Sequence, residues 1–301
     1  MSLSPPFQTP DILCIGAVLW DIIGRTPGPV ALGDDLPGRI SRAPGGVALN
    51  IALALARFGM TPALLSAVGR DAEGEALVAA CDGFGLITGH LYRPDSLPTD
   101  RYMAIEGPGG LIAAIADAQT LEAAGDSILR PMTDGRLGSQ VAPWSGLVVI
   151  DGNLTPALLA DIAAAPQFAA ADLRIAAASP DKAARLKPFL RHPRATLYLN
   201  LAEARVLGGN VFASAREAAT GLLAMGAARV LVTNGGELCA EASLGLGVQT
   251  GQPPRVAIAR VTGAGDHFMA GHIAAEHRGA GRDDALAKAL AAAADHISKE
   301  I

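Results

Sequence analysis

The sequence is poor in aromatic residues and in cysteine. Aromatic side chains make up only 4% of its 301 residues although half of them are hydrophobic, so aliphatic side chains and alanine must fill the core. The three cysteines, Cys14, Cys81 and Cys239, are scattered and form no Cys-x-x-Cys pair. This spacing indicates neither a disulfide framework nor a thiolate zinc site, and we expect a reducing, cytoplasmic location.

An excess of positive charge is also missing. Lys and Arg number 24 against 29 Asp and Glu, which gives a net charge of -5 at pH 7. A protein that binds nucleic acid would carry a basic face, so we do not expect a nucleic-acid partner. The apolar run from 12 to 20 is too short to cross a bilayer, and the first ten residues lack the charged start of a secretion signal. We therefore expect no membrane partner.

Strand-like and helical segments alternate along the chain, which is the pattern of a parallel sheet covered by helices. We expect strands at 11–18, 62–68, 146–151, 173–178, 195–199 and 228–233. We expect helices at 47–58, 72–82, 155–164, 181–190, 201–207 and 212–226, with two more after Gly265. The length suits a single α/β domain with an insertion.

The alternation of strands and helices is interrupted by two short extended segments, 101–106 and 111–116, which flank the sequence Gly-Pro-Gly-Gly. This is a strong hairpin signal. With the Pro/Gly-rich stretch 22–43, the hairpin predicts a small β lid outside the main sheet. The predicted lid comprises 22–43 and 94–118, and the main domain 11–21, 44–93 and 119–301. The exposed apolar face of 101–116 suits a homodimer through the lid.

The segment Val261-Thr262-Gly263-Ala264-Gly265-Asp266, just before a helical run, is the most informative motif. A glycine-rich turn at a helix start leaves backbone N–H groups free to bind an anion. Asp266 would repel that anion unless it takes a proton from a hydroxyl that attacks a phosphate. The motif therefore indicates phosphoryl transfer. The alternative is that Asp266 only caps the helix and the glycines only make a tight turn.

A second glycine pair, Gly45-Gly46, precedes the helix at 47–58. The missing side chains let a ligand approach the backbone, and Asn50 can turn its amide toward the same place. We interpret this motif as a sugar or polyol contact, with an ordinary loop-to-helix junction as the alternative.

Four polar residues come at or just past the carboxyl ends of predicted strands. They are Asp21, Asp151, Asn200 and Thr233. Open parallel sheets bind ligands at that edge. Each residue alone could be a turn residue or a helix cap, but four at one edge predict a binding site there.

With these motifs, the chain resembles the ribokinase-like (PfkB) carbohydrate kinases over nearly its whole length. Further segments that fit in order and spacing are Ile15-Gly16 through Asp21, Leu65 to Asp71, Asn200 to Glu203 and Val232 to Gly235. Within the family it is most similar to pseudouridine kinases. That similarity lies in Pro37 to Ile40, Leu64 to Gly69, Ile115 to Asp117, Asp151 to Asn153, and Val261 before Thr262.

The resemblance implies a ribokinase-like α/β fold: a mostly parallel sheet flanked by helices on both faces, with a small inserted β lid. It implies an ATP-dependent kinase that uses Mg²⁺ and phosphorylates the 5'-hydroxyl of a ribosyl compound, pseudouridine being preferred. A kinase for another nucleoside, for ribose or for a ketose is the alternative within this class. A catalytically silent nucleoside-binding sensor is the alternative from another class. The intact Asp266 disfavours a sensor, because binding alone gains nothing from a carboxylate beside the γ-phosphate.

The resemblance also implies a role for each matching residue. Asp21, Gly45, Gly46 and Asn50 would form the sugar pocket, with Asp117 and Asn153 as candidate contacts to the base or ribose. Asn200 and Glu203 match the Asn-x-x-Glu signature that positions magnesium, with Glu203 acting through a water molecule, and Thr233 and Gly235 match the nucleotide-binding turn. Gly263, Ala264 and Gly265 would form the anion hole, and Asp266 would be the base.

Three positions depart from the family pattern. Leu19 stands where sugar kinases usually carry an asparagine, and Leu238 where the nucleotide turn often has a glycine. Arg260 replaces an aspartate common near a monovalent-cation site, and its positive charge opposes a bound potassium ion. The substrate and any potassium dependence therefore stay open.

Three histidines, His267, His272 and His277, fall on one predicted helix. Their five-residue spacing turns each about 140° from the last, so they do not converge on one metal ion. We therefore expect no zinc site on this helix.

Overall fold

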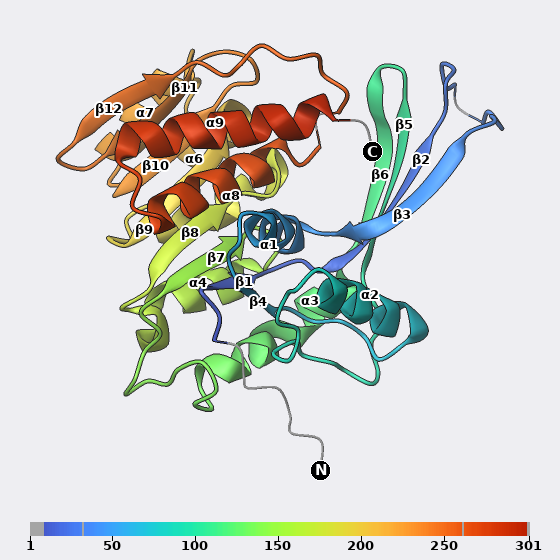
Figure 1. The fold of residues 1–301 in the computed structure, drawn as a ribbon, viewed down its shortest axis with the longest axis horizontal. Coiled ribbons are helices and arrows are strands. Elements are labelled where there is room, and N and C mark those ends of the chain that lie inside the picture. The colour runs from blue at the N-terminus through green and yellow to red at the C-terminus, as the bar shows by residue number, and fades with distance from the viewer. Residues whose placement is uncertain (1–8, 32, 261, 300–301) are drawn as a thin grey trace.

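The computed structural model describes residues 9–31, 33–260 and 262–299. Figure 1 shows a large body of sheet and helices, from one side of which a smaller sheet projects. The large sheet has eight strands and the small one four. This arrangement confirms the predicted α/β fold with a mostly parallel main sheet. No helix within the described ranges is long and apolar enough to span a membrane.

The main sheet is parallel except at one edge, where the last two strands are joined by antiparallel pairing. Its order is β12 (Gly247–Gly251), β11 (Cys239–Ser243), β10 (Arg229–Thr233), β9 (Ala195–Asn200), β8 (Asp172–Ala176), β7 (Leu147–Asp151), β1 (Ile12–Ile15) and β4 (Pro62–Leu65). Strands β10, β11 and β12 pair antiparallel, and the other neighbours pair parallel. The antiparallel edge strands β11 and β12 are not among the predicted elements.

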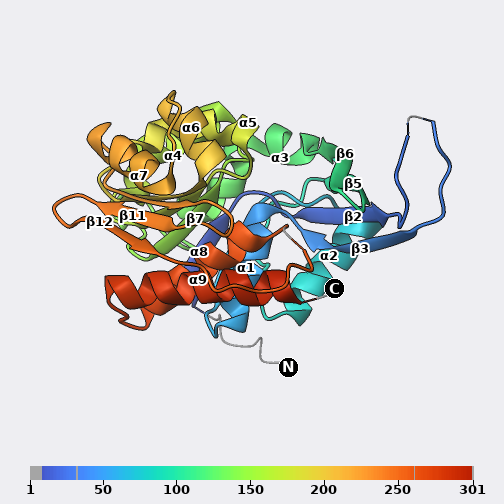
Figure 2. The same cartoon turned by 90° about the horizontal axis from the view of Figure 1, so that it is seen from above.

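Helices cover both faces of this sheet (Figure 2). One face carries α1 (Val47–Arg57), α2 (Ala72–Gly83), α8 (Ala264–His277) and α9 (Arg282–Ser298). The other carries α3 (Gln119–Ala124), α4 (Pro156–Ala164), α5 (Pro180–Ala183), α6 (Leu201–Gly208) and α7 (Ala215–Ala224). Short 3₁₀ helices lie at Gly125–Met132, Pro166–Phe168 and Ala184–Phe189. The predicted helix at 181–190 is therefore one turn of α-helix followed by a 3₁₀ helix, and α3 was not predicted.

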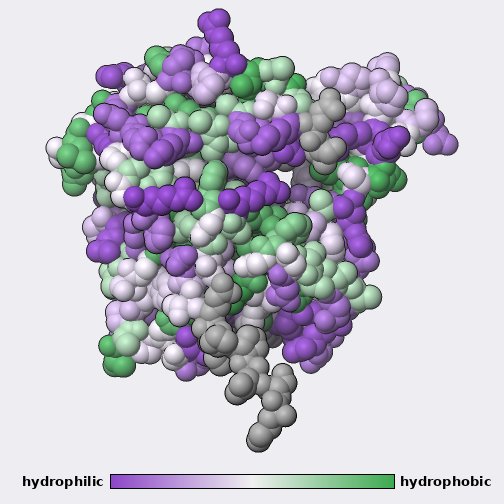
Figure 3. Space-filling view, in the orientation of Figure 1, coloured by the Kyte–Doolittle hydropathy of each residue, from purple (hydrophilic) through white to green (hydrophobic). Residues whose placement is uncertain are grey.

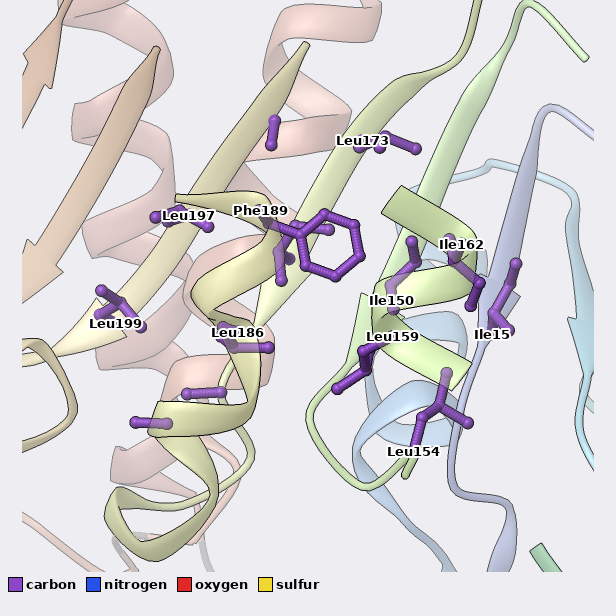
Figure 4. Close-up of a cluster of buried hydrophobic side chains, with 14 of the residues drawn as sticks. Ile15, Ile150, Leu154, Leu159, Ile162, Leu173, Leu186, Phe189, Leu197 and Leu199 are labelled. Carbon is purple, nitrogen blue, oxygen red and sulfur yellow. The ribbon is translucent and has the colours of Figure 1, made fainter. Parts of the chain in front are cut away.

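Two hydrophobic cores lie between the sheet and its two helical layers. Successive strand residues point to opposite faces, so Leu13 and Ile15 enter one core while Ile12 and Cys14 enter the other. Figure 4 shows the first core. Leucine and isoleucine side chains of the strands pack there with Phe189, which comes from a 3₁₀ helix, and with Leu159 and Ile162 of α4. Aliphatic side chains thus do most of the packing, as the scarcity of aromatic residues predicts.

The small sheet forms the lid. Its order is β3 (Arg39–Gly45), β2 (Leu19–Arg25), β5 (Arg101–Gly107) and β6 (Gly110–Asp117). The prediction of one strand over 11–18 is wrong at its end, because β1 stops at Ile15 and β2 begins at Leu19. Gly16 makes the turn possible: its φ is +148°, and an added Cβ would lie 2.3 Å from the Asp151 carboxyl carbon. Asp21 consequently lies on a lid strand and not at the end of a main-sheet strand.

Candidate active site

Asp266 lies in the first turn of α8, directly after the glycine turn. Gly263 is the N-cap residue and has a φ of 83°, in the left-handed region that favours glycine. An added Cβ at Gly263 would also lie 2.8 Å from Nε2 of His296. The backbone conformation and the close packing both require glycine at this position. Val261 lies outside the described residues.

Carboxylates from four separate elements gather around this helix start. The pKa of Asp266 is raised to about 7, first by burial and also by the negative charges of Asp151, Asp21 and Glu203, while a hydrogen bond from the Asn50 side chain opposes the rise. These groups come from β7, β2, α6 and α8. A carboxyl group with a pKa near neutrality can exchange a proton under ordinary conditions, which is what a general base requires.

Asp151 fixes the framework of this cluster. Its side chain is fully buried. Oδ2 accepts hydrogen bonds from the backbone N–H groups of Ala17 and Ala48, both at 2.9 Å, and Oδ1 accepts one from Asn153 at 2.8 Å. One carboxylate therefore ties together the loop after β1, the start of α1 and the loop after β7.

The glycine pair before α1 makes room for protein atoms. A Cβ on Gly45 would lie 2.1 Å from the carboxyl carbon of Asp21, and a Cβ on Gly46 would lie 2.4 Å from the carbonyl oxygen of Ala17. Gly46 also has a φ of +96°. Burial raises the pKa of Asp21 to about 6. The pair thus lets the Asp21 carboxylate lie against the backbone at the entrance to α1.

The residues of the Asn-x-x-Glu motif form the cap of α6. The Asn200 N–H donates to Glu203 Oε2 at 2.7 Å, and the Glu203 N–H donates to Asn200 Oδ1 at 2.9 Å. Burial raises the pKa of Glu203. Within the described ranges Glu203 Oε1 has no hydrogen-bond partner, so one oxygen of this carboxylate is available to a ligand.

Thr233 and Gly235 lie next to this cap. Thr233 ends β10 in register with Asn200 on β9. Gly235 follows in an exposed turn with a φ of +55°. The structure therefore places all four residues expected to contact the nucleotide at the carboxyl ends of two neighbouring strands.

The two residues expected to contact the nucleobase or ribose of the substrate differ in their surroundings. Asp117 is exposed at the end of lid strand β6, opposite Arg101. Asn153 follows β7, and its Oδ1 accepts a hydrogen bond of 2.6 Å from Lys182 Nζ. Sequence reasoning missed Lys182, although a lysine just after a strand and a Ser-Pro turn was a signal that could have been followed.

Two stacked histidines hold the carbonyl groups of the glycine turn. His267 and His296 stack with ring centroids 3.6 Å apart. Nδ1 of His267 is 3.0 Å from the Gly263 carbonyl oxygen, and Nε2 of His296 is 2.9 Å from that of Thr262. Because a carbonyl only accepts, these ring nitrogens carry the protons. Nδ1 of His296 then accepts from Arg260 Nη2 at 3.1 Å.

This arrangement keeps both rings neutral. Burial lowers the pKa of His267 to about 4 and lowers that of His296. The other helix histidine with a defined contact, His272, lies 2.8 Å from the Tyr198 hydroxyl. No cluster of metal-binding side chains occurs in the part of the chain that the structure describes.

The sequence from residue 9 to residue 300 matches the description "pfkB family carbohydrate kinase". The chain belongs to this family. It is therefore a phosphotransferase with an alcohol group as acceptor.

Known relatives agree with the family and with the fold. The pseudouridine kinase of Escherichia coli K12 is 27% identical over 269 residues, covering 86% of this chain and 82% of that protein. A carbohydrate kinase from Agrobacterium tumefaciens is 26% identical with a TM-score of 0.80, covering 97% and 92% of the two chains. The Arabidopsis thaliana ribokinase complexed with ribose and ATP is 18% identical, with a TM-score of 0.78 and coverage of 98% and 94%.

In this PfkB kinase, the stacked histidines predict a measurable effect on turnover. His296→Phe keeps the aromatic stack but removes the donor to Thr262 and the acceptor for Arg260. We expect kcat to fall about fivefold with KM nearly unchanged, because a looser turn would hold its backbone N–H groups less precisely toward an anion. Steady-state kinetics of this variant measure the effect. His277→Phe, at an exposed position on α8, is the control, and equal kcat values for both variants would contradict the role of the stack.

Proposed function

We propose that this protein is an ATP-dependent kinase that phosphorylates the 5'-hydroxyl of a ribosyl compound, with pseudouridine as its preferred substrate. The observation that carries the proposal is the position of Asp266. Its carboxyl group, with a pKa of about 7, lies at the amino end of α8 directly after the glycine turn. A base and an anion-binding turn at one point are what transfer of a phosphoryl group to a hydroxyl requires.

The residues of the chain divide this reaction between them. Asp266 takes the proton of the attacking hydroxyl. The backbone N–H groups of Gly263, Ala264 and Gly265 at the helix start stabilise the negative charge on the transferred group. Asp21 and Asn50 contact the sugar, and Gly45 and Gly46 leave room for the Asp21 carboxylate and the Ala17 backbone beside it. The Asp21 carboxylate accepts hydrogen bonds from the sugar hydroxyl groups.

The site around α6 fits a nucleotide with its magnesium ion. Glu203 offers one oxygen without a partner within the described ranges, and a buried carboxylate gains from a nearby cation. Magnesium prefers oxygen ligands and keeps several waters, so Glu203 would hold it through a water. Bound Mg²⁺ would neutralise charge on the phosphates. Asn200, Thr233 and Gly235 complete the proposed ATP site.

Two observations favour pseudouridine over a free sugar. The similarity to the pseudouridine kinase of E. coli is one. The other is Leu19, which is only 6% exposed and packs in a hydrophobic core, so this position offers a sugar hydroxyl no polar partner. ADP release with pseudouridine, uridine, adenosine, ribose and fructose, each with and without Mg²⁺, tests the whole proposal.

The lid suggests how two copies of the chain pair. Large hydrophobic side chains are exposed along its strands, among them Ile40 at 81%, Ile115 at 63% and Leu111 at 60%. Figure 3 shows hydrophobic residues on the lid at the upper right of the molecule. We propose a homodimer through this sheet, since such faces are normally covered. Sedimentation equilibrium should give twice the chain mass of 30.6 kDa, and Ile115→Glu should give the single chain. A wild-type protein that sediments as one chain would contradict the pairing.

A further inference from the structure

Lys182 is joined to the active site by a chain of short contacts. It lies on α5, which follows β8 at the carboxyl edge of the sheet, beside α3 in Figure 2. Its Nζ donates to Asn153 Oδ1 at 2.6 Å, and the Asn153 N–H donates to Asp151 Oδ1 at 2.8 Å. Asp151 is in turn one of the carboxylates whose charge acts on Asp266. Lys182 is therefore linked to the catalytic cluster through two residues.

The ammonium group of Lys182 has unused hydrogen-bonding capacity. A lysine carries three N–H donors, and within the described ranges only the bond to Asn153 uses one. The side chain is half-buried, and no carboxylate of the described residues lies within ion-pair distance of Nζ. The remaining N–H groups of this half-buried ammonium are therefore open to water or to a ligand that carries acceptor atoms.

The loop that presents Asn153 is held in place from the same side. Arg185, on the 3₁₀ helix after α5, donates from Nη1 to the Leu154 carbonyl oxygen at 3.1 Å and approaches that of Asn153 at 3.4 Å. This contact orders the loop, so the distance between Asn153 and Lys182 is built into the fold.

We propose that Lys182 is a substrate-binding residue that donates hydrogen bonds to a carbonyl oxygen of the nucleobase, with Asn153 positioning its ammonium group. The inference rests on the proposed function and deepens it. An ammonium only donates, so it favours a ring edge with carbonyl acceptors, as in uracil. It disfavours an edge with an amino group, as in adenine or cytosine. Lys182 thus selects pyrimidine-dione nucleosides.

The charge of Lys182 should also give this contact a pH dependence. Burial and the charge of Arg185 lower the pKa of Lys182, while Asp151 on β7 and Glu122 on α3 raise it, and the net shift is downward. Pseudouridine binding should therefore weaken at alkaline pH, as the ammonium loses its proton, before an ordinary lysine would titrate.

The test compares Lys182→Met with Lys187→Met, an exposed lysine on the same segment. Calorimetry measures Kd for pseudouridine from neutral to alkaline pH, and kinetics measure kcat/KM for pseudouridine and for ribose, which has no base. We expect Lys182→Met to weaken pseudouridine binding about tenfold, to lower kcat/KM for ribose much less than kcat/KM for pseudouridine, and to lose the alkaline weakening. Lys187→Met should match the wild type in all three.

The outcomes separate this inference from the proposed function. A Lys182→Met variant that binds pseudouridine as tightly as the wild type overturns the inference, as does an equal loss of kcat/KM for pseudouridine and ribose. Pseudouridine binding that depends on Lys182, in a wild type that transfers no phosphate to it, supports the inference and removes the proposed function.

Discussion

Replacing Asp266 with asparagine is expected to lower kcat by on the order of 10²-fold or more while substrate affinity stays within a few-fold. Asparagine keeps the size of the side chain and fits the same helix turn, but it does not accept a proton at neutral pH. The effect is therefore expected in the chemical step and not in binding. Steady-state kinetics with pseudouridine and ATP, together with calorimetric Kd values, separate the two.

The pH dependence of kcat should show whether the carboxyl group removed in Asp266→Asn is the one that titrates during turnover. The pKa of Asp266 is about 7, so wild-type kcat should rise as the pH rises through 7 and the carboxyl group loses its proton. The residual kcat of Asp266→Asn should lack this rise. Asp283→Asn, an exposed aspartate in the first turn of α9, is the matched control. Near-full turnover of Asp266→Asn would remove Asp266 from the mechanism.

A stability measurement shows whether the variant is folded. A carboxyl group whose pKa is raised on folding destabilises the folded state as the pH rises from its unfolded value toward its folded one. For Asp266 that window runs from about 4 to about 7. Asp266→Asn should therefore match or exceed the wild-type Tm at pH 8, since it removes a buried negative charge among other carboxylates.

Pseudouridine should be a better substrate than ribose or uridine by at least about tenfold in kcat/KM, equivalent to roughly 1.4 kcal/mol of transition-state preference. Leu19 carries no hydrogen-bonding group and packs in the core, so a small sugar would lack a polar partner for one hydroxyl, at a cost of roughly 1 to 3 kcal/mol. A nucleoside can offset this loss through its base. The assay is ADP release over a range of concentrations of each compound.

Uridine is the most demanding control in this comparison. Pseudouridine carries one more ring N–H than uridine, and a site that hydrogen-bonds this group rejects a compound without it by leaving a polar partner unpaired. Asp117, on the lid, and Asn153 are the candidate partners from this chain. Equal or better turnover of ribose, fructose or adenosine would contradict the pseudouridine assignment and leave the family and the role of Asp266 unchanged.

The sequence predicts elements whose pattern is local and misses those whose stability comes from tertiary contacts. Strands such as 146–151 are continuous apolar runs, and the structure has β7 at Leu147–Asp151. The edge strand β12 is Gly-Val-Gln-Thr-Gly, which carries no such signal. The N-cap residue of helix α3 is Ala118, whose side chain makes no capping hydrogen bond, so no start signal marks this helix.

The site divides in the same way. The Gly263 turn and Asp266 form one local motif, which the sequence shows directly. Asp151, by contrast, holds the loops around the site through hydrogen bonds from residues 134 and 103 positions away in the sequence. The His296 contact to Thr262 spans 34 positions and the Lys182 contact to Asn153 spans 29. A single sequence contains no sign of such pairings until the fold brings the residues together.

The product formed from pseudouridine and ATP shows which hydroxyl group of the nucleoside the protein phosphorylates. Phosphorus and proton NMR of the wild-type reaction locate the new phosphoester on the nucleoside. With Asp266 directed at the attacking hydroxyl, we predict one product, phosphorylated on the 5'-oxygen of pseudouridine, and none with Asp266→Asn on the same time scale. A phosphoester at the 2'- or 3'-oxygen, or no phosphoester from the wild-type protein, would contradict the account.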